Sequence, residues 1–253
     1  MTTPQFPVVS PVSNDLWEEF RKHTDARIAL GRSGNSMPTK HHLAFQAAHA
    51  QARDAVHTPL DTEAMLAGLA DVGWSTLLIS SAAPDRGAYL KRPDLGRRLS
   101  KQSEETLSQP MVSSDVVLVV ADGLSSTAIA ANALATLQNL VPLLQKIPVT
   151  IAPIIVATQA RVALSDHVGE LCRAKIAIIL IGERPGLSAA DSMGMYLTWM
   201  PRLGRVDAER NCISNIRAQG LEPAEAARQA AVLVEAILTH QAAGVLLGQR
   251  RAL

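Results

Sequence analysis

Several apolar runs in the chain show no alternation of polar and hydrophobic side chains. They are Ser75–Ser80, Asp115–Val120, Val149–Ala157 and Lys175–Ile181. Helical periods separate the last three runs, at about 126–145 and 166–173, and a long one follows at about 222–240. Strands that are apolar throughout are buried on both faces, which is typical of parallel sheets covered by helices. The pattern predicts an α/β fold with a Rossmann-like, mostly parallel sheet and helices on both faces.

A smaller helical portion precedes this sheet. Residues 1–13 hold three prolines and no hydrophobic period, so we expect a flexible arm there. Helical periods with polar capping residues at their starts follow at about 14–23, 39–56 and 61–71. A polar, basic stretch at 82–100 predicts a long loop. The expected organisation is an arm at 1–13, a helical portion at 14–73 and a ligand-binding sheet domain at 74–253.

Composition narrows the class of partner. Hydrophobic residues make up 47% of the 253 residues but aromatic ones only 3%, so Ala, Val, Leu and Ile must fill the core. A formal net charge of +1 favours neither nucleic acid nor a membrane surface as a partner. Cys172 and Cys212 form no disulfide framework, and the apolar runs fall short of the roughly 20 residues that span a bilayer. We therefore expect a cytoplasmic protein.

Ligands of open α/β sheets bind beyond the carboxyl ends of the strands. Three such ends can be located, at Asp122-Gly123, Ala157–Val162 and Gly182–Gly186. The last places Glu183 and Arg184 side by side between two glycines, where a large ligand can approach the backbone closely. An ordinary surface turn with a solvated ion pair explains the same residues equally well.

Familiar catalytic and cofactor motifs are missing from the chain. The sequence holds no G-x-G-x-x-G fingerprint, no phosphate-binding P-loop and no G-x-S-x-G elbow. His41, His42 and His49 fall in one predicted helix without further ligands, so we expect no metal site. Residue types alone therefore predict a ligand crevice, no catalytic residue and no complete set of catalytic groups.

Five strings, in order, resemble the small-subunit family of ethanolamine ammonia-lyase. They are Ala26–Ser36, Ala121–Ser125, Val168–Glu170, Gly182–Leu187 and Cys212–Ile216. The resemblance covers about Ala26 to the C-terminus, and the last two strings are the most specific. It implies a lyase that uses adenosylcobalamin in radical chemistry to convert ethanolamine into acetaldehyde and ammonia.

The resemblance also implies site residues and a partner. The family's cobalamin contacts match Val162, Glu183 and Cys212, and Arg184 lowers the cost of burying the carboxylate beside it. Position alone adds Asp122 and Arg161 as cofactor-binding candidates. A separate large catalytic subunit would bind most of the ethanolamine and share the cobalamin at its interface with this chain, in an assembly of about six copies of each chain.

Two further expectations concern the cofactor and the location of the protein. Many cobalamin proteins replace the lower base with the histidine of a D-x-H-x-x-G motif, and Asp166-His167-Val168-Gly169 has the wrong spacing. We therefore expect a base-on cofactor. Some relatives have a longer N-terminal arm linked to packaging, so enclosure in a bacterial microcompartment stays open. The competing hypotheses are a scaffold subunit that has lost cobalamin binding and an unrelated nucleotide-binding enzyme.

Overall fold

The structure is a computed structural model that describes residue 17 and residues 19–109 and 114–251. The chain divides into two compact units, Met1–Ala50 and Gln51–Leu253. The expected arm at 1–13 and the start of the helix expected at 14–23 lie outside the described residues. The described end of that helix is a 3-10 turn, η1 (Phe20–His23).

Helix α1 (Thr39–His57) begins in the first unit and ends in the second. It begins at Thr39 as the sequence predicts, yet Ala55 is its one buried residue. The next helix, α2 (Thr62–Asp71), is capped by the Asp61 side chain, which accepts a hydrogen bond from the backbone N–H of Ala64. Both helices confirm the expected helical periods ahead of the sheet.

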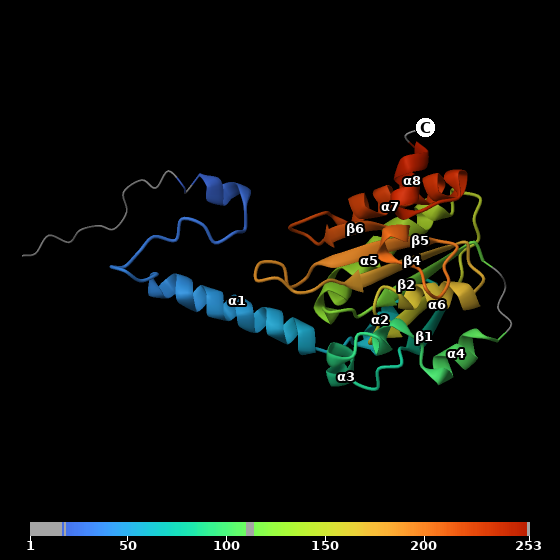
Figure 1. The fold of residues 1–253 in the computed structure, drawn as a ribbon, viewed down its shortest axis with the longest axis horizontal. Helices are drawn as coiled ribbons and strands as arrows, with labels where there is room; N and C mark the ends of the chain where they lie inside the picture. Colours follow the sequence, from blue (N-terminus) through green and yellow to red (C-terminus); the bar gives the residue numbers. More distant parts are fainter. Residues whose placement is uncertain (1–16, 18, 110–113, 252–253) are drawn as a thin grey trace, which may run out of the picture. The chain divides into compact units, whose positions relative to one another are not determined.

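The second unit is built on a six-stranded sheet (Figure 1). The strands are β1 (Thr76–Ser80), β2 (Val116–Ala121), β3 (Ile154–Thr158), β4 (Ile176–Gly182), β5 (Met193–Trp199) and β6 (Arg210–Ile216). Their order across the sheet is β1-β3-β2-β4-β5-β6. The first four pair in parallel, whereas β5 and β6 are antiparallel to their neighbours. The α/β class and the mainly parallel pairing are confirmed, and the Rossmann-like description stays a prediction.

The sequence analysis missed β5 and β6, so the sheet is more mixed than expected. In β5 the apolar run is broken by Gly194 and Thr198, and in β6 polar residues outnumber apolar ones. Such runs carry neither the continuous apolar signal of β2 nor a strict alternation. The pairing of β5 with β4, from Ile176 opposite Trp199 to Gly182 opposite Met193, supplies the stabilisation that local sequence does not show.

Helices cover both faces of the sheet because successive residues of each strand point to opposite sides. Val116, Leu118 and Val120 of β2 belong to a core shared with α2, α5 (Ser126–Leu144) and α7 (Pro223–His240). Val117, Val119 and Ala121 face a second core under α4 (Lys101–Leu107) and α6 (Leu164–Leu171). A last helix, α8 (Gly244–Arg251), buries Leu247 in the first core. The expectation of helices on both faces is confirmed.

The stretch at 82–100 is more ordered than the long loop we expected. It contains α3 (Arg86–Lys91) and a 3-10 turn, η2 (Leu95–Arg97). The Asp85 side chain caps α3 by accepting from Ala88 N at 2.8 Å, and fully buried Tyr89 anchors the helix to the domain. Six residues with one aromatic anchor give too little periodicity for a sequence-based prediction.

Helix α5 is the one helix within 19–109 and 114–251 that is long and apolar enough by itself to cross a membrane. The pair α7 and α8 meets the same criterion only together, with a bend of 75° between them. Half of the apolar window of α5 is buried, and Ile129, Leu137 and Leu140 lie fully inside the core. The composition of α5 is therefore that of a core helix packed on a sheet.

Candidate functional site

A cavity of about 400 Å³ lies at the carboxyl ends of β2 and β4. From β2 the chain passes through α5 to β3 on one side, and then through α6 to β4 on the other side of β2 (Figure 1). Such a reversal of strand order leaves a crevice between the strand ends, where open α/β sheets bind ligands. The cavity is lined by Tyr89, Gly123, Leu124, Arg161, Val162, Ile181, Gly182, Glu183, Arg184 and Tyr196.

Two glycines allow the strand ends at this cavity to meet. A Cβ atom at Gly182 would lie 2.0 Å from the carbonyl oxygen of Ser125, and one at Gly123 would lie 2.3 Å from that of Gly182. Gly123 also has a positive φ of 56°. The backbone N–H of Leu124 donates to the Gly182 carbonyl at 2.9 Å. Backbone therefore forms this part of the cavity wall, and no other residue type fits at Gly182.

Asp122 directly precedes Gly123 of the cavity wall and organises the loop that follows β3. Its carboxylate accepts hydrogen bonds from the backbone N–H groups of Gly123, Gln159 and Ala160 at 2.9, 2.9 and 3.1 Å. The Arg86 guanidinium lies 3.3 Å from the second carboxylate oxygen. Burial raises the pKa of Asp122, and the N–H donors and Arg86 oppose that shift. Asp122 thus holds the loop that presents Arg161 and Val162.

The 82–100 segment contributes residues that the sequence analysis did not single out. Tyr89 is fully buried, and its hydroxyl donates to the Ala160 carbonyl at 3.0 Å. The guanidinium carbons of Arg161 and Arg86 lie 4.3 and 4.7 Å from the centre of its ring. Arg161 also donates to the Tyr89 carbonyl at 3.2 Å. The cation–π contacts order Arg161 at the cavity wall, and a lone tyrosine in a basic stretch gave no signal of this role.

Glu183 is half-buried at the end of β4, with one carboxylate oxygen engaged by the protein. Oε2 accepts from the Ser192 hydroxyl at 2.5 Å and from the backbone N–H of Asn215 at 3.4 Å. A Cβ atom at Gly194 would lie 2.9 Å from Oε1, so the glycine in β5 leaves room for the carboxylate in this position. Arg184 lines the same cavity and is exposed.

Cys212 lies in β6, directly opposite Tyr196 of β5. The two residues are neighbours across the strand pair, and Tyr196 lines the cavity. Cys212 is exposed, and desolvation of its thiol by the neighbouring residues raises the pKa of Cys212, which favours the protonated thiol at neutral pH. The antiparallel strands missed from the sequence are therefore what bring Cys212 to this side of the molecule.

The structure brings the sequence-predicted residues into one region. Val162, Glu183, Arg161 and Arg184 line the cavity itself. Asp122 adjoins its wall through Gly123, and Cys212 contacts it through Tyr196. Tyr89 and Tyr196 join the site, and within the described part of the chain Glu183 forms no ion pair with Arg184 of the kind expected for an ordinary surface turn.

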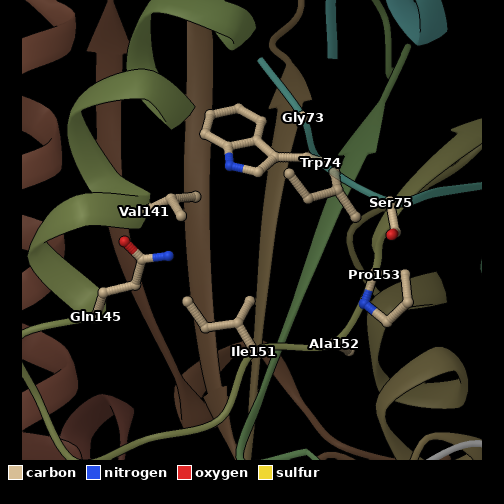
Figure 2. Close-up of a pocket in the computed structure, with 9 residues that line it drawn as sticks. Gly73, Trp74, Ser75, Val141, Gln145, Ile151, Ala152 and Pro153 are labelled. Atoms are coloured by element: carbon tan, nitrogen blue, oxygen red, sulfur yellow. The ribbon is translucent and has the colours of Figure 1, made fainter. Parts of the chain in front are cut away.

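A second cavity, of about 260 Å³, lies at the opposite ends of β1 and β3. Figure 2 shows the side chains of Trp74, Val141 and Ile151 around the same space. No titratable side chain lines this cavity, and Ser75 and Gln145 are its polar residues. Amino ends of parallel strands are not where such sheets bind ligands, so the first cavity is the candidate site.

Metal ligands do not cluster in the described part of the chain, where no group of three His, Cys, Asp or Glu side chains could hold an ion. His167, the histidine of the near-miss motif, is buried in α6 and lies 3.8 Å from Glu104. It does not line the candidate cavity. The site therefore offers carboxylate, guanidinium, hydroxyl and apolar contacts for an organic ligand.

Comparison with known proteins assigns the chain to a family. Residues 14–248 match the model for the ethanolamine ammonia-lyase light chain (EutC). Ethanolamine ammonia-lyase small subunits from Xanthomonas campestris pv. campestris and Ralstonia nicotianae are each 47% identical over 251 residues, which is 98% of this chain and 90% and 93% of theirs. The one from Pseudomonas syringae pv. tomato is 49% identical over 235 residues, 91% of this chain and 82% of its own. The chain therefore belongs to the family of ethanolamine ammonia-lyase small subunits.

Proposed function

We propose that this chain holds adenosylcobalamin for an ethanolamine ammonia-lyase, at the interface with the large catalytic subunit. The observation that carries the proposal is the convergence of Val162, Glu183, Arg161 and Arg184 on one cavity at the carboxyl ends of β2 and β4. These residues come from the loop after β3 and from the end of β4, which are far apart in sequence. Cofactor sites of α/β proteins are assembled in this way.

The chemistry of the cavity fits the rim of a corrin ring, which bears neutral amides. Amide N–H groups need acceptors, and Glu183 Oε1 has no hydrogen bond from the described residues. Amide carbonyls need donors, and the guanidinium groups of Arg161 and Arg184 line the cavity. Val162 and the glycine backbone at Gly123 and Gly182 supply an apolar and closely approachable surface.

The size of the cavity supports a shared site. A volume of about 400 Å³ is small for a cofactor as large as adenosylcobalamin, so only part of the molecule enters this chain. Most of the cofactor would remain exposed unless another protein covered it. A large subunit above the cavity would complete the enclosure and exclude water from the reacting atoms.

When bound, adenosylcobalamin supplies the radical chemistry that converts ethanolamine to acetaldehyde and ammonia. The residues of this chain bind and orient it: Glu183 accepts from amides, Arg161 donates, and the Tyr89 ring fixes Arg161. The protonated thiol of Cys212 fills space beside Tyr196. None of these groups handles substrate, which we assign to the large subunit. This chain is therefore a lyase subunit that acts only in the complex.

The cofactor is proposed to keep its own lower base on cobalt. No histidine lines the cavity, and His167 lies outside it in α6, where its Nε2 is 3.8 Å from Oε1 of Glu104 in α4. Electron paramagnetic resonance of the cob(II)alamin form, with the protein labelled with ¹⁵N, checks this point. Hyperfine coupling that is unchanged by the label supports the base-on form, and coupling altered by protein ¹⁵N contradicts it.

The assembly follows from the same proposal. We expect about six copies of each chain in a cytoplasmic complex, and light scattering of the purified complex measures that stoichiometry. Enclosure of the complex in a microcompartment is a separate matter that fractionation of cells would decide. Neither outcome alters the role assigned to the cavity.

Deamination of ethanolamine with added adenosylcobalamin tests the proposed function. The rate is measured for this chain alone, for the cognate large chain alone and for their mixture. Activity confined to the mixture supports a cofactor-holding subunit, and Glu183→Ala should then raise the cofactor concentration needed for half-maximal rate. Full activity of the large chain alone would reduce this protein to a scaffold, and activity of this chain alone would favour an unrelated enzyme.

A further inference from the structure

A third cavity, of about 340 Å³, shares Arg161 and Val162 with the proposed cobalamin site. Arginines dominate its polar lining: Arg97, Arg161, Arg205 and Arg210. We propose that this arginine cavity binds the phosphate of the cofactor's nucleotide tail. The proposal rests on the proposed function and adds to it a subsite, a ligand group and residues outside the cobalamin contacts already named.

Two of the four arginines are neutralised by carboxylates of the protein. Arg210 makes a two-pronged ion pair with Asp166, at 2.5 and 2.7 Å. Arg205 pairs with Glu209 and donates to the Met200 carbonyl. The cavity's one lining carboxylate, Asp207, has a side chain that is 98% exposed.

The other two arginines have no carboxylate partner among residues 19–109 and 114–251. Arg97 is exposed, and its side chain has no hydrogen bond or ion pair with the described residues. Arg161 donates only to the Tyr89 carbonyl and stacks on the Tyr89 ring. The cavity therefore has a positive charge that the described part of the chain does not balance.

Two buried N–H donors of the arginine cavity lack acceptors, which favours binding of an anion there. The Arg210 side chain is only 2% exposed, and its Nε makes no hydrogen bond, with Asp207 Oδ1 at 3.5 Å as the nearest charge partner. Arg161 Nε is also buried without an acceptor. A buried donor left unsatisfied costs about 1–3 kcal/mol, which an incoming anion would recover. Helix α6 begins directly after Ala163 of the cavity wall, so its amino end adds to the positive potential.

The phosphate of the cofactor's nucleotide tail is the anion whose expected position matches this cavity. Cobalamin's peripheral amides are neutral, and its one anionic side-chain group is the phosphate diester that leads to the lower base. A base-on cofactor keeps that diester close to the corrin. The shared wall at Arg161 and Val162 places the arginine cavity next to the space assigned to the corrin. Guanidinium groups match phosphate oxygens in charge and geometry.

Two cofactor analogues separate this subsite from the rest of the cobalamin site. Adenosylcobinamide lacks the whole nucleotide tail, and adenosylcobinamide phosphate retains the phosphate without the base. Their dissociation constants are measured by equilibrium dialysis against the complex of this chain with its large subunit. The variant is Arg97→Gln, and the matched control is Arg98→Gln, which alters a neighbouring exposed arginine outside the cavity lining.

Arg97→Gln should weaken binding of adenosylcobinamide phosphate about tenfold, as expected for loss of a charge-assisted contact, and leave adenosylcobinamide unaffected. Arg98→Gln should change neither dissociation constant. An equal effect of Arg97→Gln on both analogues, or no effect on either, would overturn the subsite. Phosphorus NMR with inorganic phosphate tests whether the cavity is instead a site for a free anion. Phosphate binding that Arg97→Gln abolishes, together with equal wild-type affinities for the two analogues, would contradict a role in holding the cofactor. Failure of the wild-type complex to bind either analogue would instead reject the proposed function itself.

Discussion

The Ser192 hydroxyl donates a hydrogen bond to Glu183 Oε2 at 2.5 Å, and the backbone N–H of Glu183 donates to the Ser192 carbonyl at 2.9 Å. These contacts join the end of β4 to the residue that precedes β5. The antiparallel pairing of the two strands therefore fixes where the Glu183 carboxylate lies. A ligand amide that reaches this cavity meets an acceptor whose position is already set, which lowers the entropy lost on binding.

Replacement of Glu183 by Gln should weaken adenosylcobalamin binding without unfolding the chain. The substitution keeps the shape of the side chain but removes the charge that strengthens a hydrogen bond from an amide, so we expect a dissociation constant about tenfold higher. Equilibrium dialysis of the complex measures the change. Glu235→Gln, at an exposed position of α7, is the control and should bind like the wild type. Equal affinity of all three proteins would remove Glu183 from the site.

Gly182→Ala should destabilise the domain and disrupt the cavity. The added Cβ would meet backbone at Ser125 and Asp122, at 2.0 and 2.5 Å, and backbone cannot move aside as a flexible side chain can. The expected loss in free energy of unfolding is about 2–4 kcal/mol, measured by urea denaturation. Gly186→Ala is the matched control in the same loop, because the nearest atoms lie 3.9 Å from its new Cβ. Similar free energies of unfolding for both variants would contradict the close packing of Gly182 against the backbone of Asp122 and Ser125.

The buried pair of Asp166 and Arg210 should be costly to break. Both side chains are at most 2% exposed, and the pair joins α6 to β6 behind the arginine cavity. Asp166→Asn leaves the guanidinium buried without its counter-charge, so we expect a loss of about 3–5 kcal/mol in the free energy of unfolding. Asp94→Asn breaks an exposed pair with Arg92 and should leave that free energy unchanged. Equal free energies of unfolding for Asp166→Asn and Asp94→Asn would show that the buried pair contributes no more to stability than the exposed one.

Asp115 should make stability depend on pH in the acid range. Hydrogen bonds from Lys175 and from the backbone of Thr150 hold the pKa of its carboxyl below the usual value. A lowered folded-state pKa stabilises the protein above the unfolded pKa of about 3.9, and that contribution is lost as the pH falls through the folded value. Asp115→Asn should therefore cost about 1 kcal/mol at pH 7 and nothing at strongly acid pH. Urea denaturation at several pH values checks this, and a constant difference would contradict it.

The sequence predicted much of the fold because its strands and helices carry strong periodic signals. The runs at β2 and β4 are apolar throughout, and Asp61 and Pro223 mark helix starts where the structure has them. The antiparallel strands β5 and β6 were not predicted because pairing of β5 with β4, and of β6 with β5, stabilises them more than local residue preference does. The strand that carries Cys212 therefore gave no signal in the sequence.

The candidate site was predictable to the extent that it follows from the ends of parallel strands. Glu183, Arg161 and Val162 lie where the switch-point rule places ligand contacts. Tyr89 and Arg86 were not predictable, because a short helix inside a basic stretch has no distinctive period and their contacts to the 159–161 loop are long-range. The role of Asp122 as an internal acceptor of backbone N–H groups likewise required the tertiary structure.

Direct measurement of cobalamin uptake tests the central claim that the cavity at the ends of β2 and β4 holds the cofactor. Equilibrium dialysis with adenosylcobalamin compares the large chain alone, its complex with the wild-type chain and its complex with Val162→Arg, which places a long charged side chain in the cavity. Size-exclusion chromatography establishes that the variant complex still assembles. We predict about one cofactor per small chain in the wild-type complex, with weak uptake by the other two. Equally tight binding by the large chain alone, or by the assembled Val162→Arg complex, would contradict the account.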